Sequence, residues 1–277
     1  MGIVVNTNIS ALNAQNYLSN NQVGLSKAIQ RLSSGLRINN AADDPAGLAI
    51  SVSMQQTSSA LATGAQNANN GISLVQTAEA AMKDISTILT TMSTLASQAA
   101  SGTYSSTQLG NLNTQFNALL NEINRVAENT QFNGITLLNG SSASLTIQVG
   151  SGATSNDQLT INLTELTTGT AGLSISSLDI STSGGATTAI TSLTSAINSV
   201  TTALAGLGAN QSNLEAAASV DTSLATSLNA AKSRIEDADF AAESSNLAKY
   251  NVLTQSSIAM LAQANSLPQQ VLRLVQG

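Results

Sequence analysis

The feature that most constrains this chain is a seven-residue repeat of apolar side chains, which dominates both halves of the sequence. Its longest run begins at Leu61 and continues for almost six heptads to Ala99. Residues spaced alternately by three and four positions share one face of a helix, and two such helices can pair along that face. If residues 46 to 100 form one helix, its length is about 80 Å, which is too long for a compact globule of this size. The repeat therefore predicts a rod of long helices.

Shorter apolar stripes lie on both sides of this run. They cover 18 to 36, 109 to 126, 190 to 235 and 253 to 274. In the first stripe Leu18, Gln22, Leu25, Ile29, Leu32 and Leu36 follow the heptad, and in the last Leu253, Ser257, Met260 and Ala264 do so, followed by Leu267, Val271 and Leu274. Because an isolated amphipathic helix is marginal in water, these stripes need partner helices.

Local signals mark where helices begin and end. The Asp-Asp-Pro sequence at 43 to 45 offers an acidic N-cap and a proline at the first helical position. Ser105 and Gln108 have the spacing of a capping box, which predicts another helix start. That helix is expected to end near the Asn-Gly pair at 133 and 134. Pro268 is expected to kink or stop the last helix.

The middle of the chain changes to a two-residue period. The sequences LTIQV (145 to 149), LTINL (159 to 163) and LSISSLDI (173 to 180) alternate apolar and polar residues and are separated by Gly, Ser, Asn and Asp. We interpret them as short strands in hairpins. The predicted fold is mainly α, an elongated antiparallel helical bundle or coiled coil, with a small β-hairpin region in the middle of the chain.

Composition excludes most catalytic and ligand-binding classes. The chain has no His and no Cys, which removes the usual general base, thiolate nucleophiles and the commonest metal ligands. No Lys or Arg lies between Arg125 and Lys232, and the net charge is −6, which argues against nucleic acid binding. No apolar run approaches the roughly 20 residues of a membrane span. We expect no enzyme activity, no cofactor, no metal and no membrane insertion.

Two acidic groupings could suggest metal ligands. The acids at 43 and 44 are interpreted as a helix cap, and the run of Glu236, Asp237, Asp239 and Glu243 lacks the spacing of a calcium loop. The second group is interpreted as a solvated face or as ion pairs between subunits. Asn, Gln, Ser and Thr flank the apolar stripes where a free coiled coil carries Glu and Lys, which favours packing against other protein on several sides.

Five segments of the sequence resemble the bacterial flagellin family. They are NTNISALNAQ (6 to 15), RLSSGLRINNAADDPAGLAI (31 to 50), NANNGISLVQTAEAAM (67 to 82), LLNEINRVAENTQFNGITLLNG (119 to 140) and AAKSRIEDADFAAESSNLAKYNVLTQSSIAMLAQANSLPQQVL (230 to 272). The resemblance covers roughly 1 to 140 and 186 to 277 and leaves no room for the large variable outer domains of longer flagellins. It implies a short flagellin, a structural subunit that polymerises into the helical filament used for swimming.

The resemblance also implies a domain organisation and a set of partners. Residues 1 to 44 and 237 to 277 correspond to terminal helices of the inner filament core, residues 45 to 140 and 186 to 236 to the long-helix rod, and 141 to 185 to its short hairpin region. The family is secreted unfolded by flagellar type III export, without a cleaved signal. Besides other copies of the chain, the implied partners are an export chaperone, the filament cap and hook-filament junction proteins.

Two sets of residues are predicted to make contacts. The polymer interface is expected at Leu18, Leu25, Ile29, Leu32, Met260, Leu267 and Val271. The segment that vertebrate Toll-like flagellin receptors recognise in the family aligns with Thr91, Leu95, Gln98 and Gln115. Strong agonists carry Arg and Glu where this chain has Thr91 and Gln115, so it is predicted to be a weak receptor ligand.

Three other functions compete with this interpretation. A hook-filament junction protein shares the terminal architecture and differs in copy number. A secreted adhesin or effector needs an elaborated outer domain, which 141 to 185 hardly provides. An enzyme is the weakest alternative, because no catalytic motif accompanies the many Ser residues.

Overall fold

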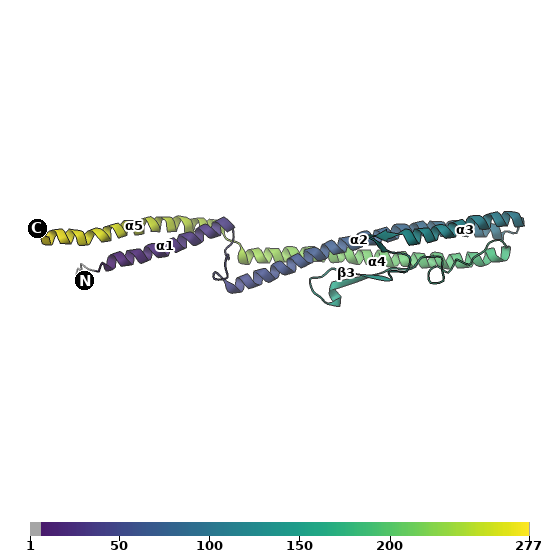
Figure 1. Ribbon diagram of the computed structural model, residues 1–277, viewed down its shortest axis with the longest axis horizontal. Helices are drawn as coiled ribbons and strands as arrows, with labels where there is room; N and C mark the ends of the chain where they lie inside the picture. Colours follow the sequence, from purple (N-terminus) through teal and green to yellow (C-terminus); the bar gives the residue numbers. More distant parts are fainter. Residues whose placement is uncertain (1–6, 277) are drawn as a thin grey trace. The chain divides into compact units, whose positions relative to one another are not determined.

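The computed structural model describes residues 7–276, with side chains for all of these except 267–269 and 271–276. Its helices are α1 (Ile9–Ser34), α2 (Pro45–Ala100), α3 (Ser106–Asn129), α4 (Ser183–Glu236) and α5 (Phe240–Gln276). The strands are β1 (Gln131–Phe132), β2 (Ile135–Thr136), β3 (Ser144–Gln148) and β4 (Gln158–Asn162), and a short 3-10 helix, η1, covers Ser155–Asp157. The mainly α fold with a small β region is confirmed (Figure 1).

Contacts divide the chain into two units. Unit 1 comprises Met1–Gln56 and Ser227–Gly277, and unit 2 comprises Thr57–Thr226. Both α2 and α4 continue through these divisions without a break. The expected terminal segments were 1 to 44 and 237 to 277, so unit 1 is larger than expected by residues 45–56 and 227–236.

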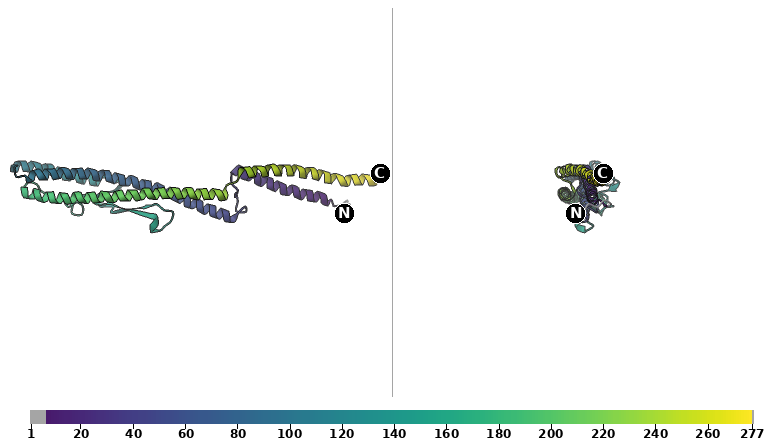
Figure 2. Two further views of the ribbon diagram at one scale, coloured as in Figure 1. Left: turned by 180° about the vertical axis from the view of Figure 1, so that it is seen from behind. Right: turned by 90° about the vertical axis from the view of Figure 1, so that its left-hand side faces the viewer.

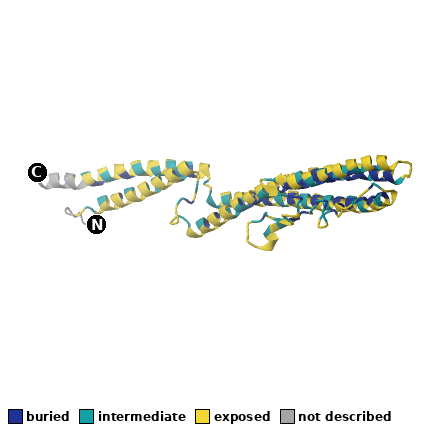
Figure 3. Ribbon diagram, turned by 45° about the vertical axis from the view of Figure 1, so that its right-hand side comes forward, coloured by how far each residue is buried: buried dark blue, intermediate teal, exposed yellow. Residues whose placement is uncertain are grey.

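Unit 2 has a continuous apolar core. There α3 lies beside α2 and α4 (Figures 1 and 2), and their facing sides are the buried ones (Figure 3). The large side chains that are fully buried include Met82, Ile85, Leu89, Met92, Phe116 and Ile123. Nine of the heptad positions predicted from Leu61 to Ala99 belong to this core, namely Ala68, Val75, Ala78, Met82, Ile85, Leu89, Met92, Ala96 and Ala99.

Both predicted helix starts are confirmed. Helix α2 begins at Pro45, and the Asp44 Oδ1 atom accepts a hydrogen bond of 2.9 Å from the Gly47 amide. Helix α3 begins after Ser105, whose hydroxyl accepts from the Gln108 amide at 3.3 Å while the Gln108 side chain accepts from the Ser105 amide at 2.9 Å. This reciprocal capping satisfies two amides that the first helical turn leaves unpaired.

The β region differs in part from the prediction. Strands β3 and β4 form the expected antiparallel hairpin, with Leu145 opposite Ile161. The third predicted strand, 173 to 180, is wrong, because this segment forms turns and coil. Leu173, Ile175 and Ile180 are nevertheless buried. The alternation of apolar and polar residues in this segment therefore reflects a loop whose apolar side chains are buried, and not a paired strand.

Two further differences concern the ends of helices. Helix α3 ends at Asn129, before the Asn-Gly pair, because β1 and β2 form an additional tight hairpin around that pair. Asn133 and Gly134 have φ angles of 49° and 80°, as a type I′ turn requires. The stop expected at Pro268 is not observed, since α5 is helical to Gln276.

Among the described residues, no helix has an apolar stretch long enough to cross a lipid bilayer. The same part of the chain contains no group of three or more His, Cys, Asp or Glu side chains that could hold a metal ion.

A candidate self-association surface on the terminal helices

In unit 1, α1 and α5 pack against each other along a seam of alternating three- and four-residue steps. On α1 the seam comprises Ala14, Leu18, Asn21, Leu25, Ala28 and Leu32, each buried or half-buried. On α5 it comprises Glu243, Leu247, Tyr250, Thr254, Ser257, Leu261 and Ala264, which are also buried or half-buried. The fully buried members of the seam are small or polar, in contrast to the large apolar core of unit 2.

Polar contacts and close approach fix the register of this seam. The Asn21 side-chain amide donates to the Ser257 hydroxyl at 2.9 Å, and the Asn8 side-chain amide donates to the Ala264 carbonyl at 2.7 Å. Gly24 lies under the Tyr250 ring, where a β-carbon would come within 2.5 Å of a ring atom. Since each of these contacts requires one particular pairing of residues, the seam specifies a unique alignment of the two helices.

Several large apolar side chains of these helices lie outside the seam and are exposed. On α1 the exposed ones are Ile9, Leu12, Tyr17, Val23 and Ile29, and on α5 they are Phe240, Val252, Leu253, Ile258 and Met260. Met260 is 63% exposed and Phe240 is 69% exposed. Exposure of this many large apolar side chains, on a helix pair whose most buried positions are small or polar, is unusual for a soluble protein. Exposed apolar side chains in this number indicate an interaction site.

Part of this surface is hollowed into a groove of about 460 Å³ between the two helices. Its lining includes the apolar parts of Tyr17 and Met260 and the polar side chains of Asn21 and Ser257. A groove lined by apolar side chains and a few polar groups is suited to receive a side chain from another protein surface.

The predicted interface residues fall into two groups. Leu18, Leu25 and Leu32 are half-buried in the seam, whereas Ile29 and Met260 are exposed. The side chains of Leu267 and Val271 lie outside the described residues. Of the stripe positions, Gln22, Ile29, Leu253 and Met260 are exposed and lie outside the α1–α5 seam, and the polymer contacts expected at Ile29 and Met260 stay a prediction. Hydrophobicity alone selected large residues, while Asn21, Ala28, Thr254 and Leu261 occupy the contact positions.

The link that follows α1 is tied to the link that precedes α5. The Arg37 amide donates to the Glu236 carbonyl at 2.6 Å, the Ala238 amide donates to the Gly35 carbonyl at 2.9 Å, and the Arg37 guanidinium donates to the Ile235 carbonyl at 2.5 Å. Gly35 adopts a left-handed conformation, φ 73°, that ends α1. The two links therefore form a short antiparallel clasp.

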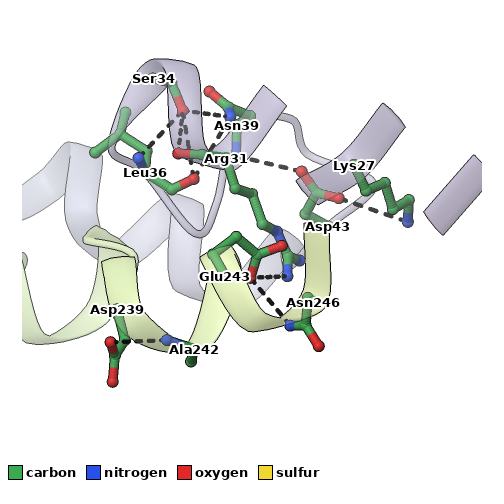
Figure 4. Close-up of polar contacts among 10 residues, drawn as sticks. All are labelled: Lys27, Arg31, Ser34, Leu36, Asn39, Asp43, Asp239, Ala242, Glu243 and Asn246. Carbon is green, nitrogen blue, oxygen red and sulfur yellow. Dashed lines mark hydrogen bonds and ion pairs between the residues drawn. The ribbon is translucent and has the colours of Figure 1, made fainter. Parts of the chain in front are cut away.

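A group of charged side chains lies beside this clasp (Figure 4). Arg31 of α1 is 3.9 Å from the buried carboxylate of Glu243 on α5, and Lys27 is 3.9 Å from Asp43. The pKa of Asp43 is lowered, first by the hydrogen bond from the Asn39 amide, then by the Asn40 amide and the positive charges of Lys27 and Arg31. The acidic group around Glu243 thus pairs within the subunit, although sequence reasoning left contacts between subunits open.

The receptor-aligned residues lie in unit 2. Thr91 and Gln98 are exposed on α2 and Gln115 is exposed on α3, whereas Leu95 is buried in the core. The Thr91 hydroxyl donates to the Thr87 carbonyl at 3.0 Å, so it is engaged with its own helix. Only the exposed three present side chains to a partner.

Comparison with known proteins identifies similar chains. Residues 5–143 match the model of the bacterial flagellin N-terminal helical region, and residues 190–275 match that of the C-terminal helical region. Flagellin of Listeria innocua is 38% identical over 98% of this chain and 99% of its own length. The flagellar filament 30.7 kDa core protein of Treponema maltophilum is 35% identical over 99% of this chain and 100% of its own. The crystal structure of Bacillus cereus flagellin gives a TM-score of 0.51 at 30% identity and covers 60% of this chain and 94% of that one.

Proposed function

The chain belongs to the bacterial flagellin family, and from this premise we propose that the exposed apolar faces of α1 and α5 join it to other copies in the flagellar filament. The protein is a structural subunit whose polymer is the propeller for swimming. The observation that carries the proposal is the number of large apolar side chains that the terminal helices expose, among them Ile29, Val252 and Met260.

The mechanism of assembly is burial of this apolar surface between identical subunits. A contact that joins two different patches on neighbouring copies does not close on itself, so it repeats as an open helix. Burying a fully exposed Val, Ile or Met side chain contributes about 1.5–3 kcal/mol to the free energy of association. The large apolar side chains exposed on α1 and α5 therefore provide a sufficient driving force after the loss of subunit freedom.

The polar seam and the clasp have a supporting role in this proposal. They hold α1 and α5 in one register, so that the outward faces of the pair present one pattern to the next subunit. We assign residues 1–44 and 237–277 to the inner core of the filament and 45–236 to the outer rod, which includes the short hairpin region at 141–185. The division of contacts at 56 and 227 supports a separate terminal unit.

The remaining steps of the proposal concern export and partners. The chain is secreted through the flagellar export apparatus and polymerises outside the cell, between hook-filament junction proteins and a cap. A chaperone covers the apolar face of α5 before export, because that face is a self-association hazard. The chain has no enzymatic activity. It is a weak ligand of the Toll-like flagellin receptor, because Thr91 and Gln115 offer no charge at two exposed positions.

Seeded elongation tests the proposal. Purified chain is dissociated to monomer, mixed with short filament seeds and followed by electron microscopy, alongside a version that lacks residues 1–40 and a point variant, Ile29→Asn. We expect long filaments from the full chain, none from the truncated chain and slower growth from the point variant. Elongation at equal rates by all three would refute the assignment of this surface.

A further inference from the structure

Asp221 lies on α4 at a heptad position that is otherwise occupied by large apolar residues. Leu193, Val200, Leu207 and Leu214 recur every seven residues along α4 and are at most 1% exposed. Asp221 is the next residue in this series and is 7% exposed. A carboxyl group therefore replaces a core side chain of unit 2, and a polar group at such a position lowers stability unless it is hydrogen-bonded.

The surroundings of Asp221 supply no positive charge. The facing stretch of α2, residues 46 to 78, has no charged residue, and no Lys or Arg occurs between Arg125 and Lys232. Its own helix carries one other charge between 183 and 231, the exposed Glu215, which accepts a hydrogen bond from Gln211. The β3–β4 hairpin contributes a single charge, Asp157. Burial, and secondly the negative charge of Asp157, raise the pKa of Asp221 above its usual value.

A backbone carbonyl of the hairpin and the Asp221 carboxyl group both lie beside Gly64. Asp221 Oδ2 is buried without a hydrogen-bond partner. A β-carbon at Gly64 of α2 would clash with the Val149 carbonyl oxygen and would lie 3.0 Å from Asp221 Oδ2, so both oxygens lie at the space that glycine leaves open. Asn67 of α2 donates to the neighbouring Gln148 carbonyl at 3.0 Å and holds this part of the hairpin against the helix.

A metal ion fits this place less well than a proton. The Asp157 carboxylate already accepts hydrogen bonds from the Thr154 amide at 3.1 Å and from the Thr154 hydroxyl at 2.6 Å. One free carboxylate oxygen and one carbonyl fall far short of the six to eight oxygen ligands of calcium. A neutral carboxylic acid, in contrast, has an O–H group that can donate to a carbonyl oxygen.

We propose that Asp221 is a proton-operated latch that holds the β3–β4 hairpin against α2 and α4. In its neutral form the carboxyl group donates a hydrogen bond to the Val149 carbonyl and is compatible with the apolar interior. Loss of the proton places a carboxylate beside that carbonyl and Asp157, so the hairpin detaches more readily. The latch concerns the interior of one subunit and does not depend on the proposed assembly surface.

The sign of the pH dependence follows from the raised pKa. The stabilisation from Asp221 is complete below the ordinary aspartate value of about 3.8 and is lost as pH rises through the higher value of the folded protein. Between these two values the unfolding equilibrium constant changes by about tenfold for each pH unit. Other carboxylates have the opposite effect, so the contribution has to be measured as a difference between variants.

The test compares wild type with Asp221→Asn in the full-length monomer from pH 4 to pH 8. The asparagine amide can donate to the Val149 carbonyl at every pH. Asp84→Asn, at an exposed position on α2, is the control for loss of one charge. We expect the unfolding midpoint of Asp221→Asn to rise relative to wild type as pH increases, with no such trend for the control. A gap that is constant or that narrows with increasing pH overturns the proposal.

Two measurements test the latch without the Asp221→Asn variant. In wild type, the carboxyl carbon of Asp221 should titrate in NMR above 3.8, and titration at or below this value refutes a latch. Hydrogen exchange of residues 144–162, corrected for its intrinsic pH dependence, should accelerate as Asp221 loses its proton. Unchanged protection of the hairpin across that titration also refutes the proposal. The variant Asp221→Leu, which restores the apolar series, should show neither effect.

Discussion

Replacement of Met260 by glutamine tests the assembly surface quantitatively. The two side chains have similar length and helix propensity, so the change removes apolar character and leaves α5 intact. Met260 is 63% exposed in the subunit. Since full burial of a methionine contributes about 1.5–3 kcal/mol, the exposed part offers about 1–2 kcal/mol to a contact with another copy. A loss of this size raises the critical concentration for polymerisation by about 5- to 30-fold.

The assay is sedimentation of seeded filaments over a range of total concentrations, with the unpolymerised chain measured in the supernatant. Gln263→Ser is the matched control, because it shortens an exposed polar side chain close to Met260 on the same helix. We expect the control to lie within about twofold of wild type. The thermal midpoint of the Met260→Gln monomer should be unchanged. An unchanged critical concentration, or a monomer destabilised as much as the polymer, would show that Met260 does not face another subunit.

Three further predictions address separate parts of the molecule. Gly64→Ala should lower the denaturation midpoint of unit 2, because the added β-carbon clashes with the Val149 carbonyl and outweighs a helix-propensity gain of up to about 1 kcal/mol. Gly206→Ala, where a β-carbon enters open space, should raise the midpoint. Equal midpoints for the two variants would contradict the close approach at Gly64. Asp43→Asn should destabilise the chain most at neutral pH, and the gap should narrow as pH falls through the lowered pKa, below about 3.8, which urea titration at pH 7 and pH 3 can check. Combining Thr91→Arg with Gln115→Glu should increase potency in a Toll-like flagellin receptor reporter assay, and potency equal to that of wild type would exclude a role for these charges.

Features set by local chemistry were readable from the sequence. The start of α2 at Pro45 and the capping box of Ser105 and Gln108 each depend on residues within one helical turn. The β3–β4 hairpin was predicted because its strands pair with each other across a single short connection. The length of α2 followed from its unbroken apolar repeat, with no proline between Pro45 and Ala100.

Features that depend on tertiary packing could not be predicted from the sequence. Ile175 and Ile180 alternate with polar residues like a strand, but they anchor a loop whose amides bond to Thr168 and to the Asn113 side chain. Leu18, Leu25 and Leu32 of the predicted stripe do lie in the α1–α5 seam. Asn21 and Ala28 take the places expected for Gln22 and Ile29, because they carry no strong hydrophobic signal. Asp221 lies within the predicted stripe from 190 to 235, but its unusual surroundings become apparent only when Gly64 and Val149 are seen beside it.

The composition of the α1–α5 seam has a consequence for assembly. The fully buried positions of the α1–α5 pair, such as Ala14 and Ala28, are small, and its leucines, such as Leu25, are only half-buried, so the pair is less stable in the monomer than the core of unit 2. If Ile29 and Met260 faced inward as well, the pair would be more stable alone and would present a more polar surface to other copies. With the large side chains outward, each neighbouring subunit that covers Ile29 or Met260 also stabilises the helix pair that carries them. Ordering of the terminal helices and addition of a subunit are therefore coupled, and amides in residues 9–34 should gain far more protection from hydrogen exchange on polymerisation than amides in the core of unit 2.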